Sequence, residues 1–294
     1  MKIGEIPEVG YIGVMQGRLV PPEADRIQCF PRQRWADEFK LGANSGVDSI
    51  EWIYDVWGSD ANPISSDAGI QEVRELSKQH EVAVLSVCAD YFMDRPLIRT
   101  DSEEQRSRVR LLLWLMSRCE QLGINRIVLP FVDQSAIRSQ AEMNEVIAIL
   151  KEVLPSALSR GLEIHLETSL APQEFASLLG RLPASNLRVN YDTGNSASLG
   201  YDFREELSAY GDRIGSVHIK DRLLGGGSVP LGQGNADIPG VLSALQQRGY
   251  CGDLILQIAR GESGREVEWV QRNRDIVISY IRRMPIERVG GAAQ

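Results

Sequence analysis

Four short apolar segments in the second half of the chain each end in a polar side chain that could bind a metal ion. These side chains are Glu167, Asp192, His218 and Gln257, in the segments GLEIHLETSL, LRVNYDTGNS, IGSVHIKDR and GDLILQIAR. Carboxylate, imidazole and amide groups are ligands of divalent cations. A cation bound to a carbonyl and an adjacent hydroxyl acidifies the C–H bond between them, and a nearby carboxylate then moves the proton. The four segments therefore predict a divalent-cation site that could support proton abstraction of this kind.

The alternation of residue types within these segments indicates which way the polar side chains point. Side chains two apart in a strand share a face. Leu162, Ile164 and Leu166 therefore lie on one face, and His165 and Glu167 lie on the other. A parallel sheet buried on both faces is continuously apolar, whereas a barrel places functional residues at the carboxyl ends of its strands. The pattern predicts a barrel with its site at that end.

Composition limits the kinds of protein that the chain could be. Its 294 residues suit one barrel domain of about 250 residues, and its apolar runs are too short for a membrane span. The net charge of -8 disfavours duplex nucleic acid as a partner, because such binding relies on Lys and Arg. The start, MKIGEIPEVG, carries no export signal, so a cytoplasmic protein is expected. Scattered cysteines without a CxxC pair fit reduced thiols.

Strand-like and helix-like patterns alternate along the chain. In the first half, strands are predicted at residues 11–19, 46–55, 82–90 and 124–131. Helices are predicted at residues 35–45, 66–80, 103–122, 141–159, 173–179, 203–210, 238–248 and 267–284. Such alternation implies parallel pairing, so the expected fold is α/β, a single (β/α)8 TIM barrel domain over residues 1–294 with a flexible tail at about 285–294. An open doubly wound sheet is the alternative fold, but no GxGxxG follows the first strand.

Three of the segments also carry a resemblance to a known family. The residues ETS at 167–169, YDTGN at 191–195 and HIKD at 218–221 resemble the xylose isomerase-like TIM barrels, the sugar (phosphate) isomerase and epimerase superfamily. The resemblance covers nearly the whole chain. It implies a metal-dependent isomerase or epimerase of a small sugar or sugar phosphate, with one divalent cation (Mn, Mg, Co or Zn) held by a Glu, an Asp, a His and a second Glu. Glu167, Asp192 and His218 match the first three ligands, and the fourth falls at Gln257.

Two positions depart from the family pattern. An amide at Gln257 could offer its carbonyl oxygen to a hard cation, but it cannot act as a general base, and it removes one negative charge. In the related epimerases, two metal-bound glutamates flank the reacting carbon and transfer protons on its opposite faces. Asn195 stands where such epimerases often have a His. Both differences weaken the resemblance to a two-base epimerase in particular.

Further side chains near the strand ends are candidates for catalysis and substrate binding. Glu167 is the expected base, and Lys220, on the same face as His218, could neutralise an oxyanion or hold a phosphate or carboxylate. His165 is expected to fix the carboxylate of Glu167. The substrate-binding candidates are Arg222, Glu51, Arg18 and His165. The Gly-rich stretch 225–235 could cradle a phosphate or form a mobile lid.

Simpler explanations compete with several of these roles. A strand-end Asp or Glu could cap the next helix, and His165 could be a hydrogen-bonded core histidine. Lys220 could pair with Glu51 or Asp192 inside the barrel. Each of these alternatives assigns the side chain a structural role in place of a chemical one.

Other functions stand beside the isomerase or epimerase. An apurinic endonuclease shares this barrel, but its multi-zinc site uses several histidines and this chain has three, His80, His165 and His218. A non-catalytic sugar-binding barrel would explain Gln257, and a keto-polyol dehydratase or lyase would begin at the same acidified C–H bond. The expected partner is a small carbohydrate substrate, without nucleic acid or membrane. Pairing of the barrel helices into a homo-oligomer is left open.

Overall fold

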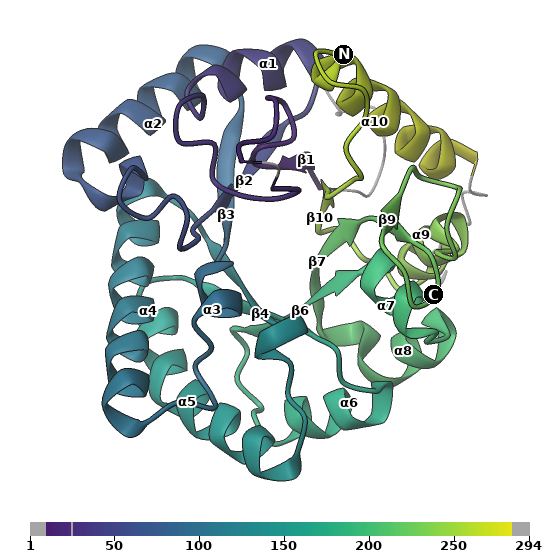
Figure 1. Ribbon diagram of the computed structural model, residues 1–294. Coiled ribbons are helices and arrows are strands. Elements are labelled where there is room, and N and C mark those ends of the chain that lie inside the picture. The colour runs from purple at the N-terminus through teal and green to yellow at the C-terminus, as the bar shows by residue number, and fades with distance from the viewer. Residues whose placement is uncertain (1–9, 25, 284–294) are drawn as a thin grey trace, which may run out of the picture.

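Eight parallel strands close into a barrel in the computed structural model, which describes residues 10–24 and 26–283. The strands are β1 (Ile12–Met15), β2 (Ser49–Ile53), β3 (Ala83–Cys88), β4 (Arg126–Phe131), β5 (Glu163–Thr168), β6 (Leu187–Asp192), β7 (Ile214–Ile219) and β10 (Asp253–Leu256). Their order around the barrel is β1, β10, β7, β6, β5, β4, β3 and β2, and β1 closes the ring by pairing with both β10 and β2. Figure 1 looks down this barrel. The predicted (β/α)8 TIM barrel fold is therefore confirmed.

Helices form a ring outside the strands (Figure 1). The larger helices are α1 (Asp37–Ser45), α2 (Asp67–His80), α4 (Ser102–Leu122), α5 (Gln140–Ser159), α6 (Pro172–Gly180), α8 (Phe203–Tyr210), α9 (Ile238–Gln247) and α10 (Glu266–Arg283). Smaller elements are α3 (Tyr91–Asp94), α7 (Thr193–Leu199) and the 3₁₀ turns η1 (Pro63–Ser65), η2 (Asp133–Ser135) and η3 (Gly211–Arg213). The larger helices lie within two residues of their predicted ranges. The residue predicted to end the last helix, Met284, lies outside the described part of the chain.

Helix α4 begins and ends at residues whose types favour those positions. The Asp101 carboxylate accepts hydrogen bonds from the backbone N–H groups of Glu103 and Glu104, both at 2.9 Å. Such a cap is worth about 1 kcal/mol. At the other end, Gly123 adopts a φ of 86°, a left-handed conformation that glycine reaches without strain. These local signals set where α4 stops and the chain turns into β4.

Apolar side chains fill the layer between the strands and the helices. Ile164, Leu166 and Val189 are at most 1% exposed and belong to the hydrophobic core. Truncating such a side chain to alanine typically costs about 2–5 kcal/mol. The alternate positions carry polar groups that meet inside the barrel, where His165 Nδ1 lies 2.7 Å from Ser216 Oγ. This division agrees with the alternation seen in the sequence.

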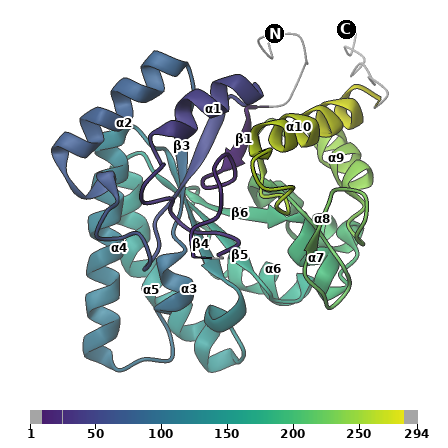
Figure 2. The same cartoon turned by 45° about the horizontal axis from the view of Figure 1, so that its top comes forward.

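Three features at the mouth of the barrel go beyond the predicted elements. Helix α7 starts immediately after β6, and an antiparallel hairpin, β8 (Asp221–Arg222) with β9 (Ser228–Val229), follows β7. The segment between β1 and α1, dark purple in Figures 1 and 2, lies over the β1 and β2 side of the barrel. Within it, Gln28 hydrogen-bonds both to Asp90, after β3, and to Gln257, after β10. This segment therefore joins two sides of the barrel above the strand ends.

Several expectations concern the chain as a whole. Within residues 10–24 and 26–283, no helix is both long enough and apolar enough to cross a membrane. The cysteines are free thiols, as predicted: Cys29, Cys88, Cys119 and Cys251. That residues 1–294 form one domain stays a prediction, and the expected flexible tail at 285–294 lies outside the described residues.

Candidate active site

Glu167, Asp192 and His218 come together at the carboxyl ends of the adjacent strands β5, β6 and β7. One ligand atom from each side chain lies within 4.8 Å of the other two, and all three side chains are buried. His218 Nδ1 is 3.3 Å from Glu167 Oε2 and 4.0 Å from Asp192 Oδ2. Three of the four predicted ligands thus form a compact donor set, called here the acidic cluster.

Asp192 divides its carboxylate oxygens between two environments. Oδ1 caps α7 by accepting hydrogen bonds from the backbone N–H groups of Gly194 and Asn195, at 2.9 and 2.8 Å. Oδ2 is buried and has no hydrogen-bond partner, although Lys220 Nζ lies 3.5 Å away. Leaving a buried carboxylate oxygen unpaired is unfavourable, so an additional ligand at Oδ2 would stabilise it. Helix capping therefore accounts for the hydrogen bonds of Oδ1 but leaves Oδ2 without a structural role.

Glu51 fixes the orientation of the His218 ring. Its Oε1 is 2.6 Å from His218 Nε2, and neither side chain is exposed. Because the carboxylate accepts the Nε2–H, His218 Nδ1 is left facing Glu167 and Asp192. Burial disfavours the imidazolium, but Glu51 and Glu167 outweigh burial and raise the pKa of His218 to about 10. The structure differs here from the predicted contact of Glu51 with substrate, because Glu51 is fully buried behind His218.

Two asparagine side chains hold the Glu167 carboxylate. Asn190 Nδ2 donates to Oε2 at 2.8 Å, and Asn195 Nδ2 donates to Oε1 at 2.7 Å. Asn195 Oδ1 accepts in turn from Arg222 Nη1 at 2.8 Å. The departure from the family pattern at Asn195 therefore supplies a group that orients Glu167. Alternation along β6 places Asn190 on the same face as Asp192, and this signal could have identified Asn190 from the sequence.

His165 lies deeper in the barrel than Glu167 and does not contact it. Its Nδ1 is 2.7 Å from Ser216 Oγ, and its Nε2 is 2.9 Å from Glu163 Oε2. Ser216 Oγ donates to Asn190 Oδ1 at 2.6 Å, and Asn190 donates to Glu167. The predicted role of His165 in fixing the Glu167 carboxylate is therefore indirect, and its predicted contact with substrate does not fit the structure, because His165 is fully buried. His165 supports Glu167 through two intervening side chains.

Lys220 and Gln257 lie beside the acidic cluster. Lys220 Nζ donates to Gln257 Oε1 at 3.1 Å and is 3.5 Å from Asp192 Oδ2. The ammonium therefore pairs with Asp192 and not with Glu51. Gln257 Nε2 donates to Gln28 Oε1 at 3.0 Å, so the carbonyl oxygen of Gln257 is the end that faces Lys220. This is the orientation in which an amide could bind a cation.

A cavity of about 410 Å³ opens at the mouth of the barrel. Its lining includes five predicted site residues, namely Glu167, Lys220, Gln257, Arg18 and Arg222. Its size falls in the range of small-molecule sites. The cavity therefore brings the expected base together with the expected cationic side chains, while His165 and Glu51 lie outside its wall.

Hydrogen bonds already occupy much of both guanidinium groups in this wall. Arg18 donates to two backbone carbonyl oxygens, at 2.9 and 2.8 Å, and to Gln28 Oε1 at 3.0 Å. Its burial lowers the pKa of Arg18 to about 9. Arg222 donates through Nε and Nη2 to the carbonyl oxygen of Gly226, at 3.0 and 2.8 Å. Both arginines are therefore held in place at the cavity.

Asp221 organises the Gly-rich stretch 225–235. Its carboxylate accepts hydrogen bonds from the backbone N–H groups of Gly232, Gly234 and Ala236, at 2.8, 2.9 and 3.0 Å. Asp221 itself is fully buried. Three backbone N–H groups of this region therefore bind a carboxylate of the protein, while Gly227 and Ser228 line the mouth of the barrel, and a phosphate site in the stretch stays a prediction.

The chemistry of the acidic cluster fits a divalent cation. Asp192 Oδ2 and His218 Nδ1 are buried atoms without hydrogen-bond partners, and both belong to the cluster. One imidazole nitrogen with carboxylate oxygens is a ligand set that zinc, manganese and similar ions accept. Glu167, Asp192 and His218 could therefore hold such an ion.

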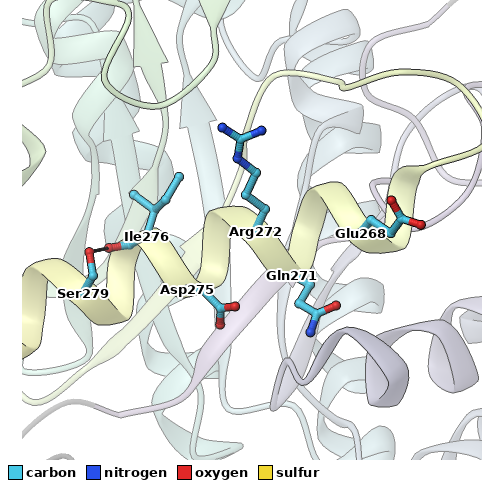
Figure 3. A pocket seen from close by; sticks show the side chains of 6 residues that line it. All are labelled: Glu268, Gln271, Arg272, Asp275, Ile276 and Ser279. Carbon is cyan, nitrogen blue, oxygen red and sulfur yellow. Dashed lines mark hydrogen bonds between the residues drawn. The ribbon is translucent and has the colours of Figure 1, made fainter.

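A second hollow, of about 490 Å³, lies on helix α10 and is lined by that helix alone (Figure 3). Its lining residues are Glu268, Gln271, Arg272, Asp275, Ile276 and Ser279. Arg272 and Ile276 point to one side of the helix in Figure 3, and Gln271 and Asp275 point to the other. Helix α10 belongs to the outer ring (Figure 1), so this hollow is formed without any residue of the barrel strands.

The fold and the acidic cluster define a (β/α)8 barrel with a candidate metal centre at its mouth. The model of the xylose isomerase-like TIM barrel family matches residues 39–276. The chain belongs to this family, as the resemblance of its motifs predicts.

Named relatives and solved structures are similar over most of their length. The L-ribulose-5-phosphate 3-epimerase UlaE of Salmonella paratyphi A is 32% identical over 256 residues, which cover 83% of this chain and 88% of that protein. A solved L-ribulose 3-epimerase has a TM-score of 0.74 at 17% identity, over 93% of this chain and 95% of that chain. The IOLI protein with a bound zinc atom has a TM-score of 0.73 at 18% identity, over 92% of this chain and 99% of that chain. The two solved structures share the barrel fold.

Proposed function

We propose that this chain is a metal-dependent isomerase or epimerase of a small sugar or sugar phosphate, and specifically an epimerase of a ketose. One observation carries the proposal: the Glu167 carboxylate belongs to the acidic cluster with Asp192 and His218 and also lines the cavity. A base for proton abstraction therefore lies where substrate and cation would meet. The names of the relatives, a 3-epimerase of L-ribulose 5-phosphate and one of L-ribulose, support this class of reaction.

Glu167, Asp192 and His218 would hold one divalent cation, with the carbonyl oxygen of Gln257 as a fourth ligand. Such a cation would polarise the substrate carbonyl and an adjacent hydroxyl, which acidifies the C–H bond between them and stabilises the enediolate. The zinc atom in the IOLI structure supports a divalent cation without deciding which one this chain prefers.

The side chains around the cluster would transfer the substrate proton and stabilise the negative charge that develops on the substrate. Glu167, oriented by Asn190 and Asn195, would remove the proton from the carbon next to the carbonyl. The Lys220 ammonium would balance the negative charge that develops on the substrate oxygen. Arg222, held at the cavity wall, would contact a hydroxyl or a phosphate at the far end of the substrate. The reaction would thus use side chains that line the cavity.

Turnover of ketoses and their phosphates tests the proposal. The protein is supplied with Mn²⁺ and incubated with a panel of pentuloses, hexuloses and their phosphates, and the epimers are separated by chromatography. Glu167→Gln should lower turnover by about 10²–10⁴-fold, because a general base is lost, and circular dichroism checks that the variant folds. The matched control is Glu152→Gln, at an exposed glutamate of α5. An unchanged rate in Glu167→Gln would contradict the proposal.

Gln257 favours a second candidate function, a non-catalytic sugar-binding barrel, because an amide has replaced a carboxylate that could transfer protons. Such a protein would gain thermal stability with a sugar but would neither convert it nor exchange its hydrogen with D₂O. Exchange that depends on Glu167 would rule this candidate out. Mass analysis of the same reactions would reveal loss of water, the product signature of a keto-polyol dehydratase.

A further inference from the structure

Epimerisation at a carbon needs proton transfer on both faces of that carbon, and Gln257 cannot transfer a proton on either face. One group removes a proton from the first face, and another returns a proton to the second. An amide neither gains nor loses a proton near neutral pH. A second titratable group must therefore reach the cavity from an element other than β10.

Four carboxylates line the cavity beside Glu167, namely Asp55, Asp90, Asp94 and Asp133. Both oxygens of Asp55 accept backbone N–H groups, at 2.9 and 2.7 Å, which gives that side chain a structural role. Asp94 and Asp133 are exposed. Asp90 differs from these three, because it is only 8% exposed and both hydrogen-bond partners of its carboxylate are side chains.

One side chain, Gln28, connects Asp90 to Gln257. Gln28 Nε2 donates to Asp90 Oδ2 at 2.7 Å, and Gln28 Oε1 accepts from Gln257 Nε2 at 3.0 Å. Arg18 Nη2 also donates to Gln28 Oε1, at 3.0 Å, and so fixes which way the Gln28 amide points. Cys88 Sγ donates to Asp90 Oδ1 at 3.0 Å. An amide has one donating and one accepting end, so Gln28 suits a carboxylate on one side and an amide on the other.

We propose that Asp90 is the second proton-transfer residue of the cavity, in the role that Gln257 cannot fill. This proposal rests on the epimerase function proposed above. Glu167 takes the proton from the carbon next to the carbonyl, and the electron pair of that C–H bond enters the enediolate. Asp90 in its protonated form then donates its proton to the same carbon as the pair forms the new C–H bond. Glu167 ends as the acid and Asp90 as the carboxylate, and exchange with water restores both.

The positions of the two groups fit this division of roles. Glu167 reaches the cavity from β5, whereas Asp90 follows β3, on the far side of β4. Burial raises the pKa of Asp90 to about 6, opposed by hydrogen bonds from Gln28 and Cys88 and assisted by Asp55 and Glu167. A proton-transfer group works best with a pKa near the working pH. Asp90 therefore carries a proton in part of the population near neutrality.

The test measures epimerisation and hydrogen exchange separately, in D₂O, with the Mn²⁺-supplied protein and three probes: L-ribulose, its 5-phosphate and D-allulose. Asp90→Asn should lower kcat for epimerisation by about 10²-fold or more, with KM within a few-fold. Solvent deuterium should still enter the recovered substrate, because Glu167 continues to remove and return the proton. Glu167→Gln should stop both processes. Asp212→Asn, the same charge change at an exposed position outside the cavity, is the matched control.

Different results would contradict the role of Asp90 and the proposed function. An unchanged kcat in Asp90→Asn, or a change in KM alone, overturns the proposal while leaving the proposed function intact. A wild-type protein that neither epimerises nor exchanges any probe overturns the proposed function, and the role of Asp90 falls with it.

Exchanging the carboxylate and the amide provides an independent check. In Asp90→Asn/Gln257→Glu, a carboxylate at position 257 supplies the titratable group that Asp90→Asn removes, and Gln28 still lies between one carboxylate and one amide. We expect the double variant to recover about 10-fold or more of the kcat lost in Asp90→Asn. The double variant also carries the test if Asp90→Asn proves unstable. Loss of both epimerisation and exchange in Asp90→Asn, without recovery in the double variant, would mean a structural role and overturn the proposal.

Discussion

Glu51 Oε1 and His218 Nε2 lie 2.6 Å apart, and both side chains are fully buried. The contact joins β2 to β7, which are not neighbours in the barrel. It therefore crosses the interior and aims His218 Nδ1 at Glu167 and Asp192. Carboxylates that accept the second N–H of a histidine fix its ring and increase its basicity as a ligand. This relationship explains why a glutamate is buried where no substrate could reach it.

Glu51→Gln should weaken metal binding by about 10–100-fold. The amide keeps an oxygen near His218 Nε2 but loses the charge that makes the imidazole a strong ligand. Competitive titration with Mn²⁺ or Zn²⁺ against a chromophoric chelator measures the change. Glu163→Gln is the matched control, since it removes a carboxylate from His165, which lies outside the acidic cluster. Equal affinities in Glu51→Gln and wild type would show that the contact does not serve a metal ligand.

The barrel and its helix bounds could be predicted because their signals are local. Asp101 and Gly123 mark the two ends of α4 by residue type, and both act there as caps. Helix α7 was not predicted, because Gly194 and Asn195 have low helix propensity. Its start depends on Asp192, whose side chain caps it only once β6 is in place. Elements of this kind take their stability from the folded barrel.

Gln257→Glu should tighten metal binding by about 10-fold or more, because a carboxylate adds charge to the ligand set. The same titration measures it. Gln28→Glu adds the same charge one side chain farther from the cluster and should have a smaller effect, since Gln28 contacts Gln257 and not the ligands. If both variants change the metal affinity equally, the added charge alone explains the effect, and residue 257 is not a ligand of the metal ion.

The acidic cluster could also be predicted in part. Glu167, Asp192 and His218 each end a strand with alternating residue types, so their common location follows from the barrel. The partners of these residues could not be predicted in the same way. Glu51 is 167 positions from His218, and Gln28 is 229 positions from Gln257. Such pairs arise only when the barrel closes, and nothing in the local pattern shows which residue pairs with which.

Ser216→Ala should destabilise the fold by about 1–3 kcal/mol, because it leaves His165 Nδ1 and Asn190 Oδ1 buried without their partner. It should also lower kcat, since Asn190 holds Glu167. Ser49→Ala is the matched control: Ser49 is likewise buried on a barrel strand, but its hydroxyl has no hydrogen-bond partner. Ser49→Ala removes an unpaired buried hydroxyl and should therefore not destabilise the fold. Urea unfolding of the two variants compares them, and equal losses would mean that the Ser216 hydrogen bonds contribute nothing.

Glu38 is a buried carboxyl group in the first turn of α1. Its Oε1 accepts backbone N–H groups of Gly17 and Leu19, at 2.7 and 3.3 Å, while Oε2 is buried without a partner. Burial raises the pKa of Glu38 from 4.5 to about 8, although the two hydrogen bonds and the charges of Arg260 and Arg18 oppose the shift. The folded protein therefore binds a proton that the unfolded chain has already released at neutral pH.

The sign of the resulting pH dependence follows from this raised pKa. The stabilisation is fully present below the unfolded value of 4.5 and is lost as the pH rises through about 8. Within that window the loss reaches about 1.4 kcal/mol per pH unit. Glu38→Gln keeps an acceptor for the backbone but cannot ionise. Between pH 5 and pH 8, wild type and the exposed-site control Glu205→Gln should therefore lose more unfolding free energy than Glu38→Gln, as measured in urea. Parallel losses in all three proteins would mean that Glu38 ionises in the folded state as readily as in the unfolded chain.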